Sequence, residues 1–177
     1  MSFIGEVNKG STYNPGYFLA YDDENVTRET REFAQNSALV VTSVDGTKHI
    51  PMGTAYPTND GNAVGIAYED VDVTVGNMPG SVVTGGAVVY EDKLAPTGES
   101  YDAATPETGD NPTEKGWYER SGSAGSYVYT LTTDTTVDAE KTYYEKTVIR
   151  LASAAKSALE ALGFKFIAST PAIVRPY

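Results

Sequence analysis

The chain contains no cysteine and a single histidine, His49, among its 177 residues. The lack of cysteine excludes disulfides, thiolate nucleophiles and cysteine-ligated zinc. One histidine cannot build a metal site alone, and a Ser-His-Asp arrangement would depend on it entirely. No Gly-x-Ser-x-Gly motif lies near it. We therefore predict that His49 is a surface or hydrogen-bonded residue, and that the protein is not an enzyme and has no catalytic residue.

Two acidic clusters, residues 22–24 and 69–72, contain the carboxylates that Ca²⁺ binds. Neither has the spacing of an EF-hand loop, and acidic turns are common in proteins without metals. The glycine-containing stretches 75–80 and 84–87 match neither of the two phosphate-binding glycine motifs. The sequence therefore predicts no metal site and no cofactor.

Clustered basic residues and long apolar runs are also missing. The 24 acidic residues outnumber the 13 basic ones, which sets the formal charge at −11. Nucleic-acid phosphates require clustered Lys and Arg, so we expect no direct nucleic-acid partner. No stretch approaches the ~20 apolar residues that cross a bilayer, and the first residues lack the pattern of a signal peptide. We expect no membrane partner and synthesis in a cytoplasm.

The middle of the chain has the pattern of short β-strands. Asp45-Gly46 and Asn59-Asp60-Gly61 are turn signals between them. Strands four to seven residues long, separated by such turns, are typical of a small antiparallel sheet or barrel. The segments expected to form strands are 38–44, 48–51, 63–68, 71–75, 81–84 and 85–90.

One helix is clearly indicated, over residues 150–162. Its apolar residues recur at spacings of three and four, which places them on one helix face. Gly163 comes next, where a helix commonly ends on a residue with positive φ. Residues 164–168 then alternate as a final strand. The apolar residues of the helix are Leu151, Ala154, Ala155, Ala158, Leu159 and Leu162.

Residues 1–36 have neither the period of a strand nor that of a helix. Glycine and proline interrupt each short apolar run, and several aromatic residues lie between them. A helix of one or two turns fits residues 26–33 at most. We interpret this region as an extended N-terminal arm.

Residues 95–147 differ in composition from both flanks. Proline and glycine dominate the first part, and a Gly/Ser stretch at 121–126 then separates two aromatic and β-branched segments, 117–120 and 127–132. This pattern predicts a hairpin with a longer loop, and residues 135–137 and 141–146 offer two more strands. Residues 91–147 hold 12 of the 24 acidic residues and 5 of the 13 basic ones.

An aromatic cluster in this segment has two interpretations. It is either a surface that stacks on a ligand such as a sugar ring or the core of a module too small to bury much else, and we favour the core. The cluster comprises Trp117, Tyr118, Tyr127, Tyr129, Tyr143 and Tyr144.

Taken together, these patterns predict a β-rich α+β fold with one amphipathic helix in its C-terminal half. A small antiparallel body is formed by residues 37–94 plus 148–177. The arm, residues 1–36, precedes it, and residues 95–147 form an inserted β-hairpin module that projects outward.

Two stretches, Asp60-Gly61-Asn62-Ala63-Val64-Gly65-Ile66-Ala67 and residues 85–94, resemble strands of the lambda-like head decoration proteins of tailed bacteriophages. The helix from residue 150 and the strand at 164–167 are similar in type and order to the C-terminal elements of that family. The module at 95–147 is an addition to the family pattern, and it looks like a short β unit that recurs in phage virion proteins.

The resemblance implies a structural virion protein that is made in a bacterial host. The resemblance further implies that such a protein binds the outer surface of the expanded capsid as a homotrimer and stabilises the head. It also implies that the arm contacts the major capsid protein, by adding a strand to a capsid sheet. The candidate contact residues are Phe3, Ile4, Tyr13, Tyr17 and Phe18.

The alternative hypothesis is a virion-surface adhesin or carbohydrate-binding module. In that case the inserted module contacts glycans on the outer surface. The candidate ligand contacts are Trp117, Tyr118, Tyr127 and Tyr129.

Overall fold

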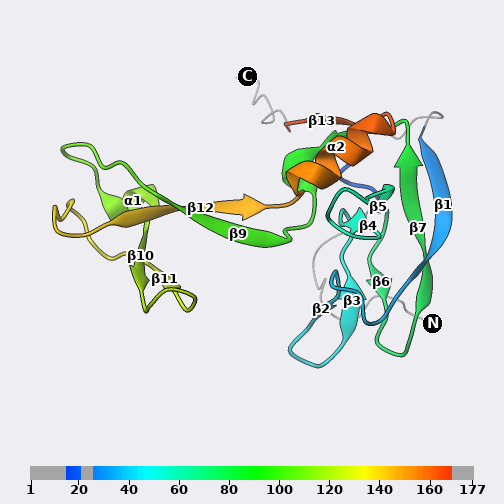
Figure 1. Ribbon diagram of the computed structural model, residues 1–177, viewed down its shortest axis with the longest axis horizontal. Helices are drawn as coiled ribbons and strands as arrows, with labels where there is room; N and C mark the ends of the chain where they lie inside the picture. Colours follow the sequence, from blue (N-terminus) through cyan, green and yellow to red (C-terminus); the bar gives the residue numbers. More distant parts are fainter. Residues whose placement is uncertain (1–14, 21–25, 169–177) are drawn as a thin grey trace, which may run out of the picture. The chain divides into compact units, whose positions relative to one another are not determined.

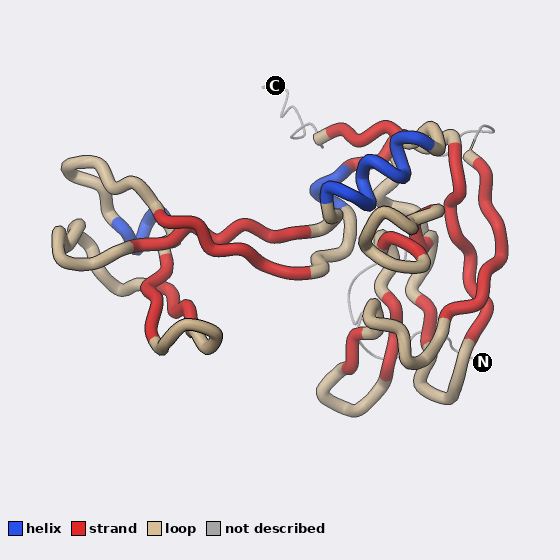
Figure 2. The backbone as a smooth tube through the Cα atoms, viewed as in Figure 1, coloured by secondary structure: helices blue, strands red, loops and turns tan. Residues whose placement is uncertain are grey.

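A computed structural model of the chain describes residues 15–20 and 26–168 (Figure 1). The chain divides into two compact units. Unit 1 comprises residues 1–97 and 150–177, and unit 2 comprises residues 98–149, close to the limits expected for the inserted module. Short strands with loops between them make up most of both units (Figure 2). The predicted fold class, β-rich α+β with one amphipathic helix in the C-terminal half, is confirmed.

Unit 1 is built around a four-stranded antiparallel sheet. Successive residues of a strand face opposite sides, so Val82 and Val83 are both fully buried but belong to different apolar clusters. The sheet is therefore covered on both faces. In spatial order its strands are β1 (Thr27–Phe33), β7 (Met78–Gly85), β5 (Gly65–Ala67) and β4 (Ala55–Tyr56).

The face that carries Val83 packs against the helix α2 (Ser153–Ala161) through Ala155 and Leu159. The face that carries Val82 packs against a three-stranded sheet through Ile50, Val71 and Val73. That second sheet contains β2 (Val41–Thr42), β3 (Lys48–Ile50) and β6 (Val71–Asp72).

The predicted helix and its stop signal are confirmed. Gly163 has φ +89°, and its amide donates to the carbonyl of Glu160 at 3.0 Å, which closes the end of α2. β13 (Lys165–Ile167) then pairs in parallel with β8 (Val88–Tyr90), which is followed by a short 3₁₀ turn, η2 (Glu91–Lys93). Because parallel neighbours need a crossover, α2 is the connection that brings β13 alongside β8.

Two predictions about the N-terminal region are wrong. Residues 27–33 form β1 rather than a helix, and Phe33 at its end is buried. Phe18 and Leu19 lie in the core of unit 1, where Leu19 forms a β-bridge with Val89. The described part of the expected arm therefore belongs to the body, because its apolar side chains fill the space beside β8.

Unit 2 contains a second four-stranded antiparallel sheet, with the order β11-β10-β12-β9. The expected hairpin is confirmed, because residues 118–121 pair with residues 128–131. β9 was not expected, and residues 135–137 form no strand. The elements are β9 (Gly98–Ala103), the one-turn helix α1 (Pro112–Lys115), β10 (Tyr118–Ser121), β11 (Val128–Leu131) and β12 (Tyr143–Ile149).

One side chain closes unit 1 where the chain leaves it and returns. Asn59 donates from Nδ2 to Thr97 Oγ1 at 2.9 Å and accepts from the amide of Ala152 at 2.9 Å. Thr97 Oγ1 in turn donates to the carbonyl of Arg150 at 3.2 Å. The two ends of the insertion are thus held together by groups of unit 1 itself.

Candidate binding surfaces

One face of the unit 2 sheet is lined by tyrosines. Tyr118 lies directly opposite Tyr144, and the register places Tyr129 and Tyr101 on the same side of the sheet. The rings of Tyr101 and Tyr129 stack with centroids 4.0 Å apart and an angle of 5° between their planes. Tyr118 meets Tyr101 edge-on, and Tyr144 meets Tyr129 in the same way. We call these four residues, Tyr101, Tyr118, Tyr129 and Tyr144, the tyrosine face.

Cations lie over the tyrosine rings. The guanidinium carbon of Arg120 is 4.3 Å from the ring centroid of Tyr127 and 5.0 Å from that of Tyr144. Lys146 forms an ion pair with Glu99, and its Nζ lies 5.9 Å from the Tyr118 ring. In these contacts the cations lie over ring faces on which a sugar would have to stack.

Trp117 does not belong to an exposed surface. Only 3% of it is exposed, its ring packs against Tyr143 with centroids 5.7 Å apart, and Nε1 donates to Glu145 Oε1 at 3.3 Å. The prediction that Trp117 contacts a ligand is therefore wrong for this structure. Of the other candidates, Tyr118 and Tyr129 are half-buried in the tyrosine face.

Tyr127 is the candidate with the most accessible ring. It is 42% exposed and lies in the loop of the β10–β11 hairpin, beside Arg120. Because the aromatic cluster also supplies the buried residues of unit 2, the core interpretation accounts for Trp117 and Tyr143. Of the four candidate ligand contacts only Tyr127 is exposed, and Arg120 lies over one face of its ring.

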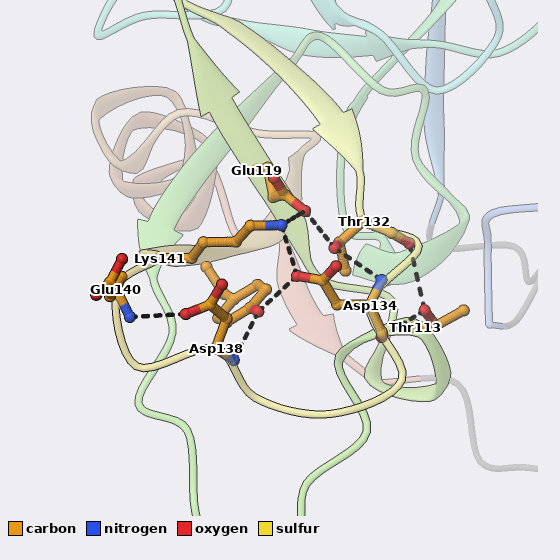
Figure 3. A network of polar contacts seen from close by, with 8 residues as sticks. Thr113, Glu119, Thr132, Asp134, Asp138, Glu140 and Lys141 are labelled. Carbon is orange, nitrogen blue, oxygen red and sulfur yellow. Dashed lines mark hydrogen bonds and ion pairs between the residues drawn. The ribbon is translucent and has the colours of Figure 1, made fainter.

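The opposite face of this sheet carries a network of polar contacts (Figure 3). Lys141 Nζ lies 2.8 Å from Asp134 Oδ2 and 3.3 Å from Glu119 Oε1. The hydroxyl of buried Tyr143 donates to Asp134 Oδ2 at 2.7 Å. Thr132, also buried, donates from its hydroxyl to Glu119 Oε1 at 2.5 Å. The network ties the loop after β11 to β10 and to the start of β12.

Hydrogen bonding shifts the pKa values in this network. The bond from Lys141 and the bond from the Tyr143 hydroxyl lower the pKa of Asp134 below its usual value. Hydrogen bonds to Asp134 and Glu119 raise the pKa of Lys141, and burial raises the pKa of Tyr143. These groups therefore keep their usual charges at neutral pH, which suits a structural network better than proton transfer.

An open depression of about 280 Å³ adjoins the network and carries both signs of charge. Lys141 on its rim is bonded to two carboxylates, and Arg120 is stacked on aromatic rings. The depression therefore has no net preference for an anion or a cation. Its lining residues are Glu119, Arg120, Glu140, Lys141, Thr142 and Tyr144.

The candidate capsid contacts have different positions. Phe18 is fully buried in unit 1, so the prediction that it contacts another protein is wrong for this structure. Tyr17 is 42% exposed and meets Phe18 edge-on. Phe3, Ile4 and Tyr13 lie outside the described residues.

The weaker candidates have structural roles. His49 is half-buried in β3, opposite Val41 and Asp72. Glu69 accepts from the amide of Ser81 at 3.1 Å, and Asp70 accepts from the amide of Met52 at 2.7 Å. Residues 22–24 lie outside the described part of the chain, and within that part no group of three or more acidic or histidine side chains could hold a metal ion.

The sequence reasoning missed one exposed surface, the outer edge of β1. Six of its seven residues are exposed, and charged side chains alternate along it in the order Arg28, Glu29, Thr30, Arg31, Glu32. A period-two pattern of apolar residues would have revealed the strand, but only Phe33 is apolar. The remaining signal was the threonine content, which is too weak by itself.

Neither helix in the described part of the chain is long and apolar enough to cross a membrane. Comparisons of the chain with protein-family models, with curated proteins and with solved structures found no match.

Proposed function

We propose that the chain is a non-enzymatic structural virion protein that binds the outside of a bacteriophage capsid and stabilises the expanded head. The observation that carries this proposal is the packing of unit 1. The four stretches that resemble head decoration proteins all contribute to one apolar core. Their contributions are Ile66 from 60–67, Val89 and Leu94 from 85–94, Leu159 from the helix and Phe164 next to β13.

Unit 2 is an accessory in this proposal. The body is closed by Asn59 across the two ends of the insertion, so attachment to the head is assigned to unit 1. Unit 2 holds 10 acidic and 4 basic residues among its 52, and we assign it to the side that faces the medium.

The mechanism is binding by contact area. A homotrimer presents three copies of unit 1, which bridge neighbouring capsomers and contact the major capsid protein. Several weak contacts that form together raise the overall affinity without any catalytic residue. Nucleic acid and membrane are not partners in this proposal, and the protein resides on the outer surface of the virion.

Co-sedimentation with capsids tests the proposal. The purified chain is mixed with expanded, undecorated phage heads assembled from the major capsid protein. We expect saturable binding, with one trimer for each three-fold position, and heads that resist heat or chelator treatment better when decorated. Absence of saturable binding at micromolar concentration would contradict the proposal.

A deletion variant separates the roles of the two units. Residues 98–149 are replaced by a short Gly-Ser linker, which Thr97 and Arg150 allow because their hydroxyl and carbonyl oxygens lie 3.2 Å apart. We expect the variant to fold and to decorate heads as the full chain does. Loss of decoration by a folded variant would move the capsid contact to unit 2.

A further inference from the structure

β1 is the end strand of the central sheet of unit 1. It pairs with β7 on one side, and no other described strand pairs with its outer edge (Figure 1). Thr27 to Glu32 are all exposed. An exposed strand edge offers a row of N–H and C=O groups to which another strand can bind.

The backbone of Thr30 faces this outer edge. Its opposite residue in β7, Ser81, donates its amide to the Glu69 carboxylate at 3.1 Å and accepts from the amide of Tyr68 at 2.9 Å. Both of these bonds lie on the β5 side, so Ser81 exchanges none with Thr30. In an antiparallel ladder the backbone groups of such a residue point away from its partner.

Two further residues of β1 share this orientation. Glu32 lies opposite Pro79, which has no amide hydrogen, and the Glu32 carbonyl accepts instead from the Tyr56 hydroxyl at 2.9 Å. Arg28 has the same orientation by alternation along the strand. By this alternation the backbone groups of Arg28, Thr30 and Glu32 point away from β7, with Thr30 at the centre and the Glu32 carbonyl already bonded to Tyr56.

The charges along this edge are complementary to themselves. Read backwards, the order Arg28, Glu29, Thr30, Arg31, Glu32 is the same sequence with each charge reversed. We propose that two copies of the chain pair antiparallel through their β1 edges, about a two-fold axis at Thr30. Arg28 then lies opposite Glu32 of the second copy, and Glu29 lies opposite Arg31 of the second copy.

This register is favoured over its neighbours by charge. The two adjacent registers that align the outward backbone groups place Glu29 opposite Glu29 or Arg31 opposite Arg31. Opposite charges directly across two strands stabilise the pair, and like charges destabilise it. In the register centred on Thr30, Thr30 of one copy forms a hydrogen-bonded pair with Thr30 of the other, and Arg28 does so with Glu32. The backbone hydrogen bonds and the charges therefore favour the same register.

Some of these groups already have contacts within one copy. The guanidinium carbon of Arg28 lies 4.6 Å from the ring centroid of Tyr68, and the Glu32 carboxylate accepts from Asn77 Nδ2 at 3.2 Å, so the charge complementarity is carried mainly by Glu29 and Arg31. The Glu32 carbonyl has a second lone pair beside the one that Tyr56 uses. Arg31 lies 2.5 Å from Glu29 in its own chain, and both are exposed, so each carboxylate can also meet a cation across the axis. Five residues a side make a small contact, and we expect weak, reversible association that does not depend on the proposed attachment to capsids.

Cysteine crosslinking tests the position of the axis, because the chain has no cysteine of its own. In the proposed pair the two Thr30 Cα atoms lie about 5.5 Å apart, within the range that a disulfide spans. The matched control is Thr27→Cys on the same strand, whose copies would lie roughly 20 Å apart. Under mild oxidation of the full chain we expect Thr30→Cys to form disulfide-linked dimers at least about tenfold faster. Equal rates for the two variants would overturn the proposal.

Charge reversal tests the complementarity. In the Thr30→Cys background, Glu29→Arg places Arg opposite Arg31, and Arg31→Glu places Glu opposite Glu29. Each variant alone should crosslink about tenfold more slowly, since two attractive pairs become repulsive. Mixing the two variants restores opposite charges at both positions, so heterodimers, identified by mass, should form as fast as the parent dimer.

Failure of the mixture to exceed the single variants would overturn the proposal, and it would mean that the charges only keep the edge unpaired. Far-UV circular dichroism checks that each variant is folded. Capsid binding is measured separately, so a failed dimer and a failed decoration protein remain distinguishable.

Discussion

Unit 1 and unit 2 bury their strands in different ways. In unit 1 both faces of the central sheet are covered by mostly aliphatic side chains, in two apolar clusters. In unit 2 the buried side chains are mainly Trp117, Tyr143 and Tyr144, and the tyrosine face stacks on itself. Large rings bury more area per residue than aliphatic side chains, which is how 52 residues exclude water from a sheet.

The acidic residues of the two units also differ in use. In unit 2, Glu99, Glu119, Asp134 and Glu145 are each bonded to a lysine, a hydroxyl or the Trp117 ring nitrogen. In unit 1, Asp45, Asp60 and Asp72 cap exposed turns. These four acidic side chains of unit 2 therefore link different strands and loops of that unit, whereas the three of unit 1 each close a single turn.

Replacement of Trp117 should have the largest effect. Trp117→Ala removes the main buried ring of unit 2, at a cost of about 3–5 kcal/mol. A 52-residue unit has a total stability of roughly 3–8 kcal/mol, so unit 2 should unfold while unit 1 stays folded. Two-dimensional amide NMR checks this, because only the signals of residues 98–149 should collapse to unfolded positions. Tyr127→Ala, at an exposed ring, is the control, and loss of unit 1 signals would show that the units are not independent.

Truncation in the core of unit 1 should destabilise unit 1 and leave unit 2 unchanged. Leu159 is fully buried on α2, and Leu159→Ala should lower the free energy of unfolding of unit 1 by about 2–5 kcal/mol. Trp117 is the one tryptophan of the chain, so its fluorescence follows unit 2, while far-UV circular dichroism follows both. In urea, the variant should show a shifted dichroism transition and an unchanged fluorescence transition. Leu162→Ala, at a side chain 45% exposed, should change neither by more than about 0.5 kcal/mol.

Local patterns were sufficient to predict several elements. The β10–β11 hairpin, α2 and its stop at Gly163 each depend on neighbouring residues, and all three form as expected. β1 and β9 do not have such a pattern, because each strand carries few apolar residues and is positioned by its partner, β7 or β12. Elements with a local signal are therefore predictable, and long-range pairing decides the rest.

The same limit applies to the candidate sites. Tyr101 joins the tyrosine face only because β9 pairs with β12, so it could not be recognised while β9 was interpreted as a loop. The burial of Phe18 depends on a bridge between Leu19 and Val89, seventy residues apart in the chain. Composition favoured the core over a ligand contact for Trp117, and its position against Tyr143 supports the core.

Acid should weaken unit 2 through Asp134. The pKa of Asp134 is lowered in the folded state by its bonds to Lys141 and Tyr143, so the stability that it contributes is present above its unfolded pKa of about 3.9. That stability is lost as the pH falls through the lower, folded pKa. The thermal midpoint from Trp117 fluorescence should therefore drop below about pH 4.

Asp134→Asn tests this assignment. The variant should have a lower thermal midpoint of Trp117 fluorescence at pH 7. That midpoint should fall less in acid than in the parent chain, because the variant has no carboxylate at residue 134 for Lys141 to bind. The matched control is Asp45→Asn in unit 1, whose carboxyl pKa is also lowered, by its bonds to Thr47 in an exposed turn. A fluorescence midpoint that falls in acid as steeply in the Asp134→Asn variant as in the parent chain would assign the acid response to other carboxylates of unit 2.

The smallest effect is expected at Arg120, whose guanidinium carbon lies over the rings of Tyr127 and Tyr144. An exposed cation–π contact contributes about 0.5–1 kcal/mol. Arg120→Ala should therefore lower the free energy of unfolding of unit 2, measured by Trp117 fluorescence in urea, by about that amount and leave the unit 1 transition unchanged. Arg120→Lys keeps the charge but not the planar stacking, and should recover only part of the loss. If Arg120→Ala has no effect while Tyr101→Ala destabilises unit 2, the tyrosines hold this face by stacking on one another and the cation adds nothing. A loss as large as that of Trp117→Ala would instead place Arg120 among the residues that hold unit 2 together.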